Sequence, residues 1–316
     1  MSKSQLTVVY VAGFGRSCST LLSQAIAQVP GTLAIGEMRN LWTTNFRENQ
    51  RCSCGTPFNA CEVWSEAVTG LKGTTPLELG PEFSRVRRYV ERCRYVPGQL
   101  TGLAPKKYRQ ALRQYCETRE ALYRKLADLS GARVLVETSK AFVSALPLLR
   151  MRDIDVRFLH LVRDSRGVAY SWTKKRERVD IEGEKLYMVR RPPSRTAGMW
   201  LVRNMAVNIL LPLLARKKYM RIRYEDFAAD PAPVLESVLR FASLPQEELN
   251  FIKGKTLNLS QTTHVAFGNP WRFNAGPVTL KLDESWRQRL PPPARRRVTA
   301  VTWPLLLYYG YLGNRT

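Results

Sequence analysis

A short segment near the N-terminus combines the residue types that bind a phosphate or sulfate group. Gly13 and Gly15 are followed by Arg16 and by a small, mostly hydroxylated run, residues 17–20 (Ser-Cys-Ser-Thr). Glycines allow a tight turn and a close approach of the backbone to a ligand. Arginine and hydroxyl groups donate hydrogen bonds to anionic oxygens. This combination predicts an anion-binding loop.

The elements on either side of the loop support this prediction. Residues 6–11 (Leu-Thr-Val-Val-Tyr-Val) form an apolar run that is too short for an amphipathic helix and predicts a buried parallel strand. After the loop, apolar residues recur at helical spacing, at Leu21, Leu22, Ala25 and Ile26. A strand, a glycine loop and a helix in this order aim unpaired N–H groups and the positive end of the helix dipole at an anion.

A nucleotide kinase with an ordinary P-loop is one alternative. That loop requires the pattern G-x-x-x-x-G-K-[ST], whose lysine reaches the β- and γ-phosphates. No Gly-Lys-[Ser/Thr] follows Gly13 at this spacing. The kinase alternative is therefore disfavoured, and the glycine loop taken alone is weak support for a ligand site.

A second segment strengthens the case for an anionic ligand. Residues 156–162 (Val-Arg-Phe-Leu-His-Leu-Val) predict another buried strand, and Arg163 follows it immediately. Ser171 lies eight positions after Arg163, which is about two turns along a helix. Both side chains can bind a phosphate, one as a planar fork of donors and the other through its hydroxyl group.

These segments and several others resemble the sulfotransferases that use 3′-phosphoadenosine 5′-phosphosulfate (PAPS). The similar blocks are residues 15–22 (Gly-Arg-Ser-Cys-Ser-Thr-Leu-Leu), 162–171 (Val-Arg-Asp-Ser-Arg-Gly-Val-Ala-Tyr-Ser), 223–227 (Arg-Tyr-Glu-Asp-Phe) and 268–273 (Gly-Asn-Pro-Trp-Arg-Phe), with Glu37 after a short strand and Ser139-Lys140 after another. The resemblance extends from about residue 6 to residue 313, and its blocks stand in the family's order.

The resemblance implies roles for individual residues at the PAPS site. Backbone N–H groups and hydroxyls of the loop would hold the 5′-phosphosulfate, and Arg16 would stabilise the leaving phosphate as a cation that cannot give up its proton. Arg163 and Ser171 would hold the 3′-phosphate that distinguishes PAPS from ATP. The implied set is Gly15, Arg16, Ser17, Cys18, Ser19, Thr20, Arg163 and Ser171, with Tyr224 at the adenine and Arg272 as a second cation at the 3′ end. Cys18 stands where the family usually has glycine.

An acceptor hydroxyl or amine must lose a proton as it attacks the sulfuryl group. A glutamate at the position of Glu37 is a proposed base in several sulfotransferases, although it could equally be a favourable carboxylate at a helix N-terminus. His264 is the second candidate, and the choice between them stays open. The acceptor itself, whether a small molecule, a sugar or a lipid, also stays open. His160 lies within an apolar strand and is predicted to be a hydrogen-bonded core residue.

The chain is strongly basic, with 50 Lys and Arg against 26 Asp and Glu and a formal net charge of +24. Nucleic acid, an anionic membrane and an acidic substrate all suit such a balance. The basic clusters are dispersed rather than gathered in one tail. This favours a basic surface around a polyanion pocket, with a nucleic-acid- or membrane-binding protein as the alternative. Because the protein supplies positive charge itself, no metal is predicted at the site.

The N-terminal residues are polar, and the longest apolar stretches, 205–215 and 298–312, are short and interrupted by Asn, Pro or Thr. The sequence therefore predicts a cytoplasmic protein without a transmembrane segment. Contact of the C-terminal helix with a membrane surface is a less favoured alternative. The oligomeric state cannot be predicted.

No linker divides the chain, so we expect a single α/β domain over residues 1–316. It would have a P-loop-like central parallel sheet flanked by helices, with a helical insert between the second and third strands. The Cys-containing loop and the insert, about 50–130, are predicted to form the acceptor side. Residues 176–195 are predicted to be a mobile loop over the site, and residues 260–278 a cap over the cofactor. The predicted strands are residues 6–11, 31–35, 133–137, 156–162 and 220–224.

Two features stay open. Cys52, Cys54 and Cys61 form a C-x-C-x6-C pattern that lacks both a C-x-x-C pair and an evident fourth ligand, so a loop with small buried thiols is favoured over a zinc site. Arg119 falls on the apolar stripe of a predicted helix, where we expect its long side chain to extend to the solvent rather than to contact an anion.

Overall fold

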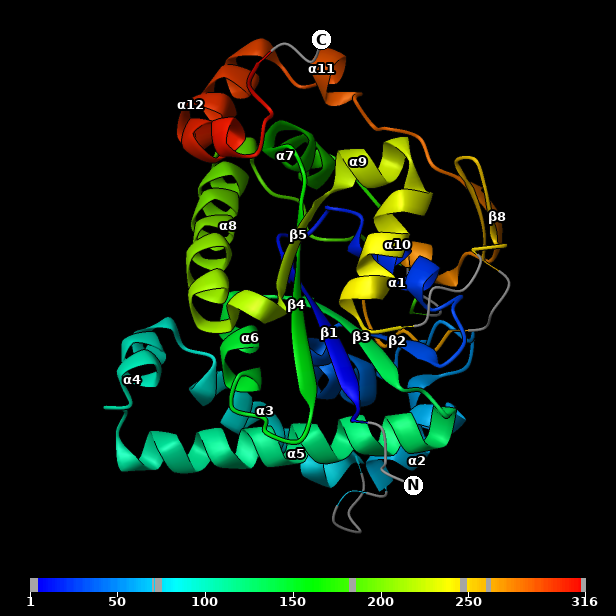
Figure 1. Cartoon of the computed structure of the whole chain (residues 1–316), viewed down its shortest axis with the longest axis vertical. Helices are drawn as coiled ribbons and strands as arrows, with labels where there is room; N and C mark the ends of the chain where they lie inside the picture. Colours follow the sequence, from blue (N-terminus) through cyan, green and yellow to red (C-terminus); the bar gives the residue numbers. More distant parts are fainter. Residues whose placement is uncertain are drawn as a thin grey trace.

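The computed structural model describes residues 5–69, 71, 76–181, 186–244, 249–259 and 263–313. Its centre is a parallel sheet of five strands in the order β2-β3-β1-β4-β5 (Figure 1). The predicted fold class is confirmed. Among the strands, β3 differs most from its predicted bounds, 133–137, because it continues to Lys140. The strands are β1 (Thr7–Gly13), β2 (Thr32–Gly36), β3 (Val134–Lys140), β4 (Asp155–Val162) and β5 (Tyr219–Arg223).

Both faces of the sheet are buried, as is usual for parallel strands. Along β1 the side chains alternate between two apolar layers, with Val8 and Tyr10 in one and Val9 and Val11 in the other. The first layer includes α5 (Lys106–Ser130), α6 (Phe142–Leu148) and α8 (Pro193–Ala215). The second includes α1 (Ser19–Ile26) and α10 (Pro231–Phe241).

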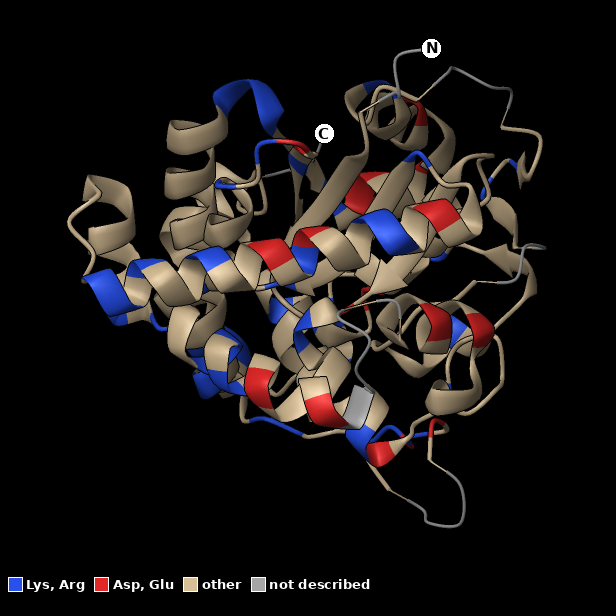
Figure 2. Ribbon diagram, turned by 90° about the horizontal axis from the view of Figure 1, so that it is seen from below, with Lys and Arg blue, Asp and Glu red and all other residues tan. Residues whose placement is uncertain are grey.

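The predicted insert between β2 and β3 is present and mostly helical. The chain leaves β2 through a 3-10 turn (Met38–Asn40) and a π-helical turn (Leu41–Phe46). The insert then contains α2 (Glu62–Thr69), α3 (Pro76–Val90), α4 (Val96–Thr101) and α5. Helix α5 crosses the lower end of the sheet in Figure 1, and Figure 2 shows basic residues at its start and mixed charges further along.

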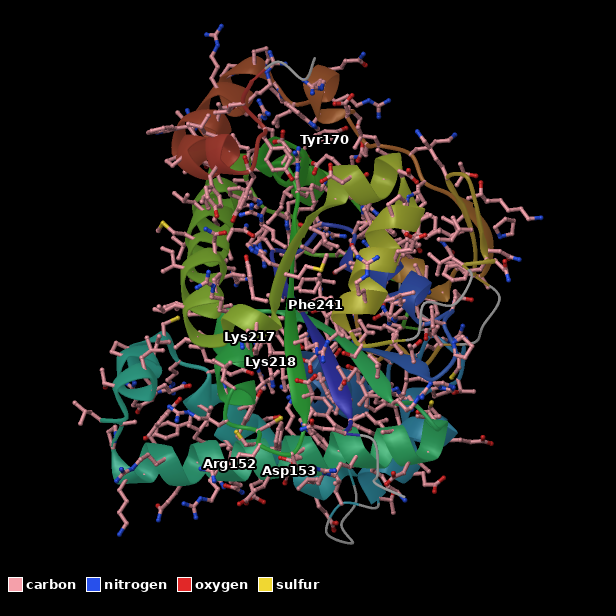
Figure 3. All side chains as sticks on the ribbon, in the orientation of Figure 1. Arg152, Asp153, Tyr170, Lys217, Lys218 and Phe241 are labelled. Atoms are coloured by element: carbon pink, nitrogen blue, oxygen red, sulfur yellow. The ribbon has the colours of Figure 1, made fainter. Side chains whose placement is uncertain are left out.

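The remaining elements surround the opposite end of the sheet. They are α7 (Ser165–Thr173), α9 (Tyr224–Ala229), a small antiparallel sheet of β6 (Ile252–Lys253), β7 (Thr256–Leu259) and β8 (Gly276–Thr279), α11 (Trp286–Arg289) and α12 (Pro292–Tyr308). In Figure 3, Tyr170 on α7 marks this end, whereas Arg152 and Asp153 mark the end beside α5. Because parallel strands finish at one edge, the loops that follow them gather near α7.

Helix α8 contains the apolar stretch 205–215, which was predicted to be too short to span a membrane. The helix begins well before residue 205, so the segment Pro193–Lys218 is long and apolar enough to cross a membrane by length and composition alone. Such a segment is weak support for a membrane span. Trp200, Val207 and Leu211 on this helix are buried, and the helix packs against α7 and α12.

Arg119 corrects one prediction. Its side chain is 2% exposed and does not extend to the solvent. It forms an ion pair with Glu137 of β3 and donates a hydrogen bond to the hydroxyl group of Tyr123 at 3.0 Å. The guanidinium is buried because a carboxylate, itself fully buried, is present to pair with it. This ion pair connects the insert to the central sheet.

We expect Arg119→Met to destabilise the fold by about 3–5 kcal/mol, because Glu137 would stay buried without its counter-ion. Urea unfolding measures this loss. Arg124→Met is the matched control, since Arg124 lies on the same helix in a partly exposed pair with Glu120, and such pairs contribute below about 1 kcal/mol. Equal losses in the two variants would contradict the assigned role of the buried pair.

Candidate active site

A cavity of about 570 Å³ opens where the parallel strands end. Its wall combines residues from the loops after four strands: Arg16 follows β1, Glu37 follows β2, Lys140 ends β3 and Arg163 follows β4. Ligands of open α/β sheets bind at this edge. Most of the residues predicted from the sequence meet here, namely Gly15, Arg16, Cys18, Ser19, Thr20, Glu37, Lys140, Arg163, Ser171 and Tyr224.

The glycine loop owes its shape to close packing and left-handed backbone. A Cβ atom on Gly13 would lie 2.5 Å from the carbonyl oxygen of Leu161 on β4, so no side chain fits there. Arg16 and Cys18 both have φ of 72°, a conformation that non-glycine residues seldom adopt. Cys18 therefore occupies a position that glycine would fill without strain. Helix α1 starts immediately afterwards, at Ser19.

Ser17 belongs to the loop, but it does not line the cavity. It is 1% exposed, and its Oγ has no hydrogen-bond partner among the residues that the structure describes. A buried hydroxyl without a partner costs free energy unless a ligand or water satisfies it. The loop that was predicted to bind an anion therefore contains a hydroxyl group, that of Ser17, which is free to donate a hydrogen bond to a ligand or water.

Several arginines on the cavity wall lie close to one another. Arg16 stacks on the ring of Trp172 at 5.0 Å and donates a hydrogen bond to the sulfur of Met188 at 3.2 Å. Burial, and next the charge of Arg176, lower the pKa of Arg16 to about 10. The group comprises Arg16, Arg176, Arg191 and Arg203. Within the described parts of the chain, no carboxylate oxygen lies within 4.0 Å of a guanidinium nitrogen of these four residues. An anionic ligand would offset this concentration of charge.

Arg163 is held in a different way. Its guanidinium donates to the backbone oxygen of Arg16 at 3.0 Å and lies 3.2 Å from a carboxylate oxygen of Asp283. Lys174 pairs with the same carboxylate oxygen at 3.3 Å. Burial acts to raise the pKa of Asp283, but the hydrogen bond from Ser285 and the charges of Arg163 and Lys174 lower it to about 2. Two cations thus share one internal counter-ion.

Ser171 and Tyr224 complete this part of the cavity. Ser171 is buried on α7 and lines the same cavity as Arg163, as their spacing predicted. The ring of Tyr224, the first residue of α9, lies 4.4 Å from the guanidinium carbon of Arg163. Its hydroxyl donates to the backbone oxygen of Lys281 at 3.3 Å and accepts from the N–H of Asp283 at 3.1 Å. Tyr224 therefore fixes both Arg163 and the segment that carries its counter-ion.

Glu37 lies across the cavity, next to Lys140. The ammonium of Lys140 is 2.5 Å from one carboxylate oxygen of Glu37, and Asn40 donates to the other at 3.2 Å. Glu37 precedes a 3-10 turn, but its side chain accepts no capping hydrogen bond from the backbone. The carboxylate instead lines the cavity. Glu37 and Lys140, which are 103 residues apart in the sequence, therefore meet at one place.

Besides Ser17, two predicted residues do not line the cavity. Arg272 is 2% exposed, lies 3.4 Å from a carboxylate oxygen of Asp180 and donates to the backbone oxygen of Gly268 at 3.2 Å. His264 lies beside the thiols of Cys52 and Cys61. Between them the chain does reach the cavity, through Phe267, Gly268, Asn269 and Trp271. Gln261 and Thr262, at the start of the predicted cap, lie outside the described residues.

The segment predicted as a loop over the site contributes Arg176, Met188 and Arg191 to the cavity wall, and its residues 182–185 lie outside the described part of the chain. None of the described residues 50–130 lines this cavity. Arg39 does line it and pairs with Glu91 of the insert at 2.8 Å.

His160 is a buried core residue as predicted, with its two ring nitrogens 2.8 Å from the Tyr219 hydroxyl and 3.0 Å from Asn204 Oδ1.

Sequence reasoning missed several residues of the site. Trp172 directly follows Ser171, and Lys174 begins a basic cluster, so both carried a local signal. Asp283 and Arg203 carried none, because each lies in a segment without a matching motif and reaches the cavity only through the fold.

The geometry agrees with comparisons to known proteins. The sulfotransferase domain of the olefin synthase from Synechococcus PCC 7002 superposes with a TM-score of 0.57, at 18% identity over 99% of this chain and 98% of that one. A sulfotransferase domain from the curacin biosynthetic pathway has a TM-score of 0.51, at 17% identity over 94% and 98%. At these identities the likeness concerns the fold. No curated protein sequence matches.

A family model described as "Sulfotransferase family" matches residues 9–248. This range contains the glycine loop, Glu37, Lys140, Arg163, Ser171 and Tyr224. The match covers most of the chain and agrees with the sheet order and the cavity described above. The chain therefore belongs to the sulfotransferase family.

Proposed function

We propose that this protein transfers a sulfuryl group from PAPS to a hydroxyl or amine group of an acceptor. The observation that carries the proposal is the convergence of two anion-binding groups on one cavity. Arg16 and the start of α1 form one group, and Arg163 with Ser171 forms the other. PAPS has a phosphosulfate at its 5′ end and a separate 3′-phosphate, so it needs two such groups.

The residues present suit this donor. The backbone N–H groups of residues 17–20 lie at the N-terminus of α1, which begins at Ser19 and where the helix dipole favours an anion. Among the described residues, the Ser17 hydroxyl has no hydrogen-bond partner, and the charge of Arg176 adds to that of Arg16; both are further reasons to place the phosphosulfate here. Arg163 and Ser171 would hold the 3′-phosphate, and Tyr224 would contact the adenine from its place beside Arg163.

When bound, PAPS supplies the sulfuryl group and a nucleotide leaving group. The sulfur–oxygen bond to the 5′-phosphate breaks as a bond forms to the acceptor oxygen or nitrogen. Negative charge then develops on the phosphate oxygen, and Arg16 is positioned in advance to stabilise it. A preformed cation of this kind lowers the barrier without moving during the reaction.

Glu37 is the proposed proton acceptor. Its carboxylate lies on the cavity wall, and Lys140 and Asn40 each hold one of its oxygens, which fixes its orientation toward the cavity. His264, the other candidate, is not on that wall. Arg272 is buried behind it, so we assign Arg272 the positioning of the Gly268 segment and no direct contact with the 3′-phosphate.

The donor assignment is tested by nucleotide binding. The protein should bind adenosine 3′,5′-bisphosphate more tightly than ATP or duplex DNA in calorimetry. Arg163→Ala should weaken that binding by about 2 kcal/mol or more, because a charge-assisted contact to the 3′-phosphate is lost, while AMP binding hardly changes. Equal losses for both nucleotides would refute the 3′-phosphate assignment, and preference for ATP would favour a kinase.

The internal counter-ion gives a second prediction. In Asp283→Asn, Arg163 and Lys174 lose the carboxylate that neutralises them, so adenosine 3′,5′-bisphosphate should bind about tenfold more tightly, equivalent to one pKa unit of charge interaction. Glu284→Gln is the control, because Glu284 pairs with Arg287 at the surface. An unchanged dissociation constant in Asp283→Asn would show that the carboxylate does not compete with the phosphate.

The third prediction concerns proton transfer. Glu37→Gln retains the shape of the side chain but accepts no proton, so turnover should fall by about two to four orders of magnitude while nucleotide binding persists. The acceptor is first found by incubating PAPS with a metabolite library and detecting sulfated products by mass spectrometry. Near-normal turnover of Glu37→Gln on that acceptor would assign the base elsewhere, and the pH–rate profile of His264→Asn would then identify or exclude His264.

A further inference from the structure

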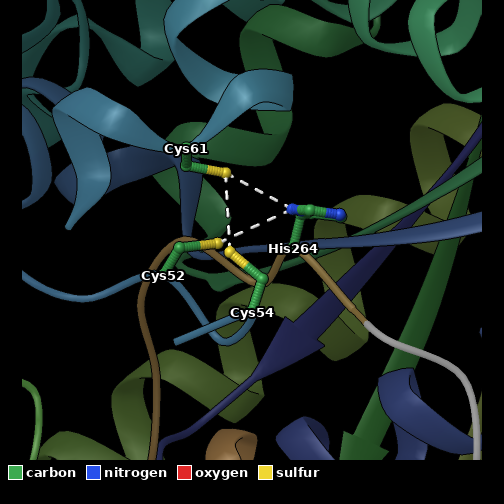
Figure 4. A group of neighbouring side chains, drawn as sticks. All are labelled: Cys52, Cys54, Cys61 and His264. Carbon is green, nitrogen blue, oxygen red and sulfur yellow. Dashed lines mark hydrogen bonds between the residues drawn. The ribbon is translucent and has the colours of Figure 1, made fainter. Parts of the chain in front are cut away.

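Cys52, Cys54, Cys61 and His264 form a compact cluster outside the cavity (Figure 4). Their four potential ligand atoms, three sulfurs and the Nδ1 of the imidazole, all lie within 4.8 Å of one another. Cys52 and Cys61 are buried, and the other two residues are partly buried. The sequence pattern lacked an evident fourth ligand, and the structure places a candidate, His264, beside the three thiols. The candidate comes from a segment more than 200 residues further along the chain.

The spacing of these atoms is that of a tetrahedral metal site. With zinc–sulfur bonds of about 2.3 Å, the sulfurs of a tetrahedral site lie about 3.8 Å apart, and sulfur and nitrogen slightly closer. Here the sulfurs of Cys54 and Cys61 are 3.7 Å apart. The Nδ1 of His264 lies 3.9 Å from the sulfur of Cys52 and 3.3 Å from that of Cys61. These three separations match those expected between ligand atoms around one tetrahedral ion.

The backbone holds the ligands in place independently of any metal. A turn joins Cys52 and Gly55, in which the N–H of Gly55 donates to the oxygen of Cys52 at 2.9 Å and Gly55 has φ of 94°. Cys61 directly precedes α2, and its backbone oxygen accepts a hydrogen bond from the N–H of Ser65 at 2.8 Å. These contacts fix the three thiols on one short loop and point them inward.

The histidine segment is fixed to the same loop. The hydroxyl of Ser53, between two of the cysteines, accepts from the N–H of Val265 at 2.8 Å. The indole of Trp64 on α2 donates to the backbone oxygen of His264 at 2.7 Å. Hydrogen bonds on both sides of the imidazole therefore orient it toward the thiols.

We propose that Cys52, Cys54, Cys61 and His264 bind one structural Zn²⁺ ion. Three soft thiolates and an imidazole suit zinc, whereas Mg²⁺ and Ca²⁺ prefer oxygen ligands. All four positions are filled by protein, which is typical of structural rather than catalytic zinc. The three thiols would release their protons to solvent on binding. Three thiolates and one Zn²⁺ ion would leave the site with a single net negative charge.

The proposed ion would fasten the cavity wall to the insert. His264 is close in sequence to Phe267 and Gly268, which line the cavity. The segment between them packs against the end of β2, where a Cβ atom on Gly36 would lie 2.8 Å from Val265 and 2.9 Å from Ala266. Cys52 and Cys61, in turn, belong to the core that contains Phe58 and Trp64. One ion would thus connect the β2 edge, the cap and α2.

The direct test is the metal content of the protein purified under reducing conditions without chelator. We expect about one zinc ion per chain by elemental mass spectrometry, as a four-ligand site requires. Replacement by Co²⁺ should give the visible absorption of tetrahedral cobalt together with thiolate charge-transfer bands, which reports thiolate ligation without any assay of activity. A metal-free protein that takes up neither ion, or an intramolecular disulfide within the cluster, would overturn the proposal.

Variants tie the metal to these residues. Cys52→Ser, Cys61→Ser and His264→Asn should each reduce the zinc content to a small fraction of the wild-type value and lower the melting temperature. Cys93→Ser and Cys116→Ser are matched controls that remove thiols outside the cluster and should keep the full content. A chelator should lower the melting temperature of these controls but not of Cys52→Ser. Zinc that persists in the cluster variants would overturn the assignment, and none of these readouts depends on the proposed donor.

Discussion

The close approach of two strand ends is the constraint on which the site depends. β1 and β4 pair along their whole length to Gly13 and Leu161, and a side chain at Gly13 would collide with the backbone of β4. Because the strands stay in contact to their last residues, the loops that follow them start side by side. Arg16 and Arg163 are therefore brought together by backbone packing, and the hydrogen bond from Arg163 to the backbone oxygen of Arg16 follows from it.

The elements around this centre contribute in different ways. The strands supply the position of each polar side chain, and α7 and α9 add Ser171 and Tyr224 behind Arg163. The insert is joined to the sheet by the buried pair of Arg119 and Glu137, and to the cavity through Arg39 and Glu91. Ion pairs of this kind specify one arrangement of the helices, because a mispaired buried charge would be costly.

The sequence was sufficient to predict the parts of the molecule that depend on local pattern. Apolar runs predicted the five strands, and the glycine loop and the Arg163–Ser171 spacing predicted two groups of residues that line the cavity. It could not predict contacts that arise only when distant segments fold together. Arg119 appeared as a cation on an apolar stripe because its partner, Glu137, belongs to a strand whose orientation relative to the helix is set by tertiary packing. The contact of His264 with the cysteines could not be predicted for the same reason, since the residues are more than 200 positions apart. Likewise, no sequence pattern connects Asp283 with Arg163.

If the cavity binds a nucleotide as proposed, the counter-ion Asp283 has a consequence for nucleotide exchange. Arg163 and Lys174 already share an ion pair within the protein. The affinity of the site for a phosphate is then the difference between two competing ion pairs, and it is smaller than the attraction of the bare cations would suggest. The same carboxylate can return to the cations as a phosphate departs, so that departure does not leave Arg163 and Lys174 without a counter-ion. Under the proposed function, a doubly phosphorylated product leaves after each cycle, and holding it less tightly would favour turnover.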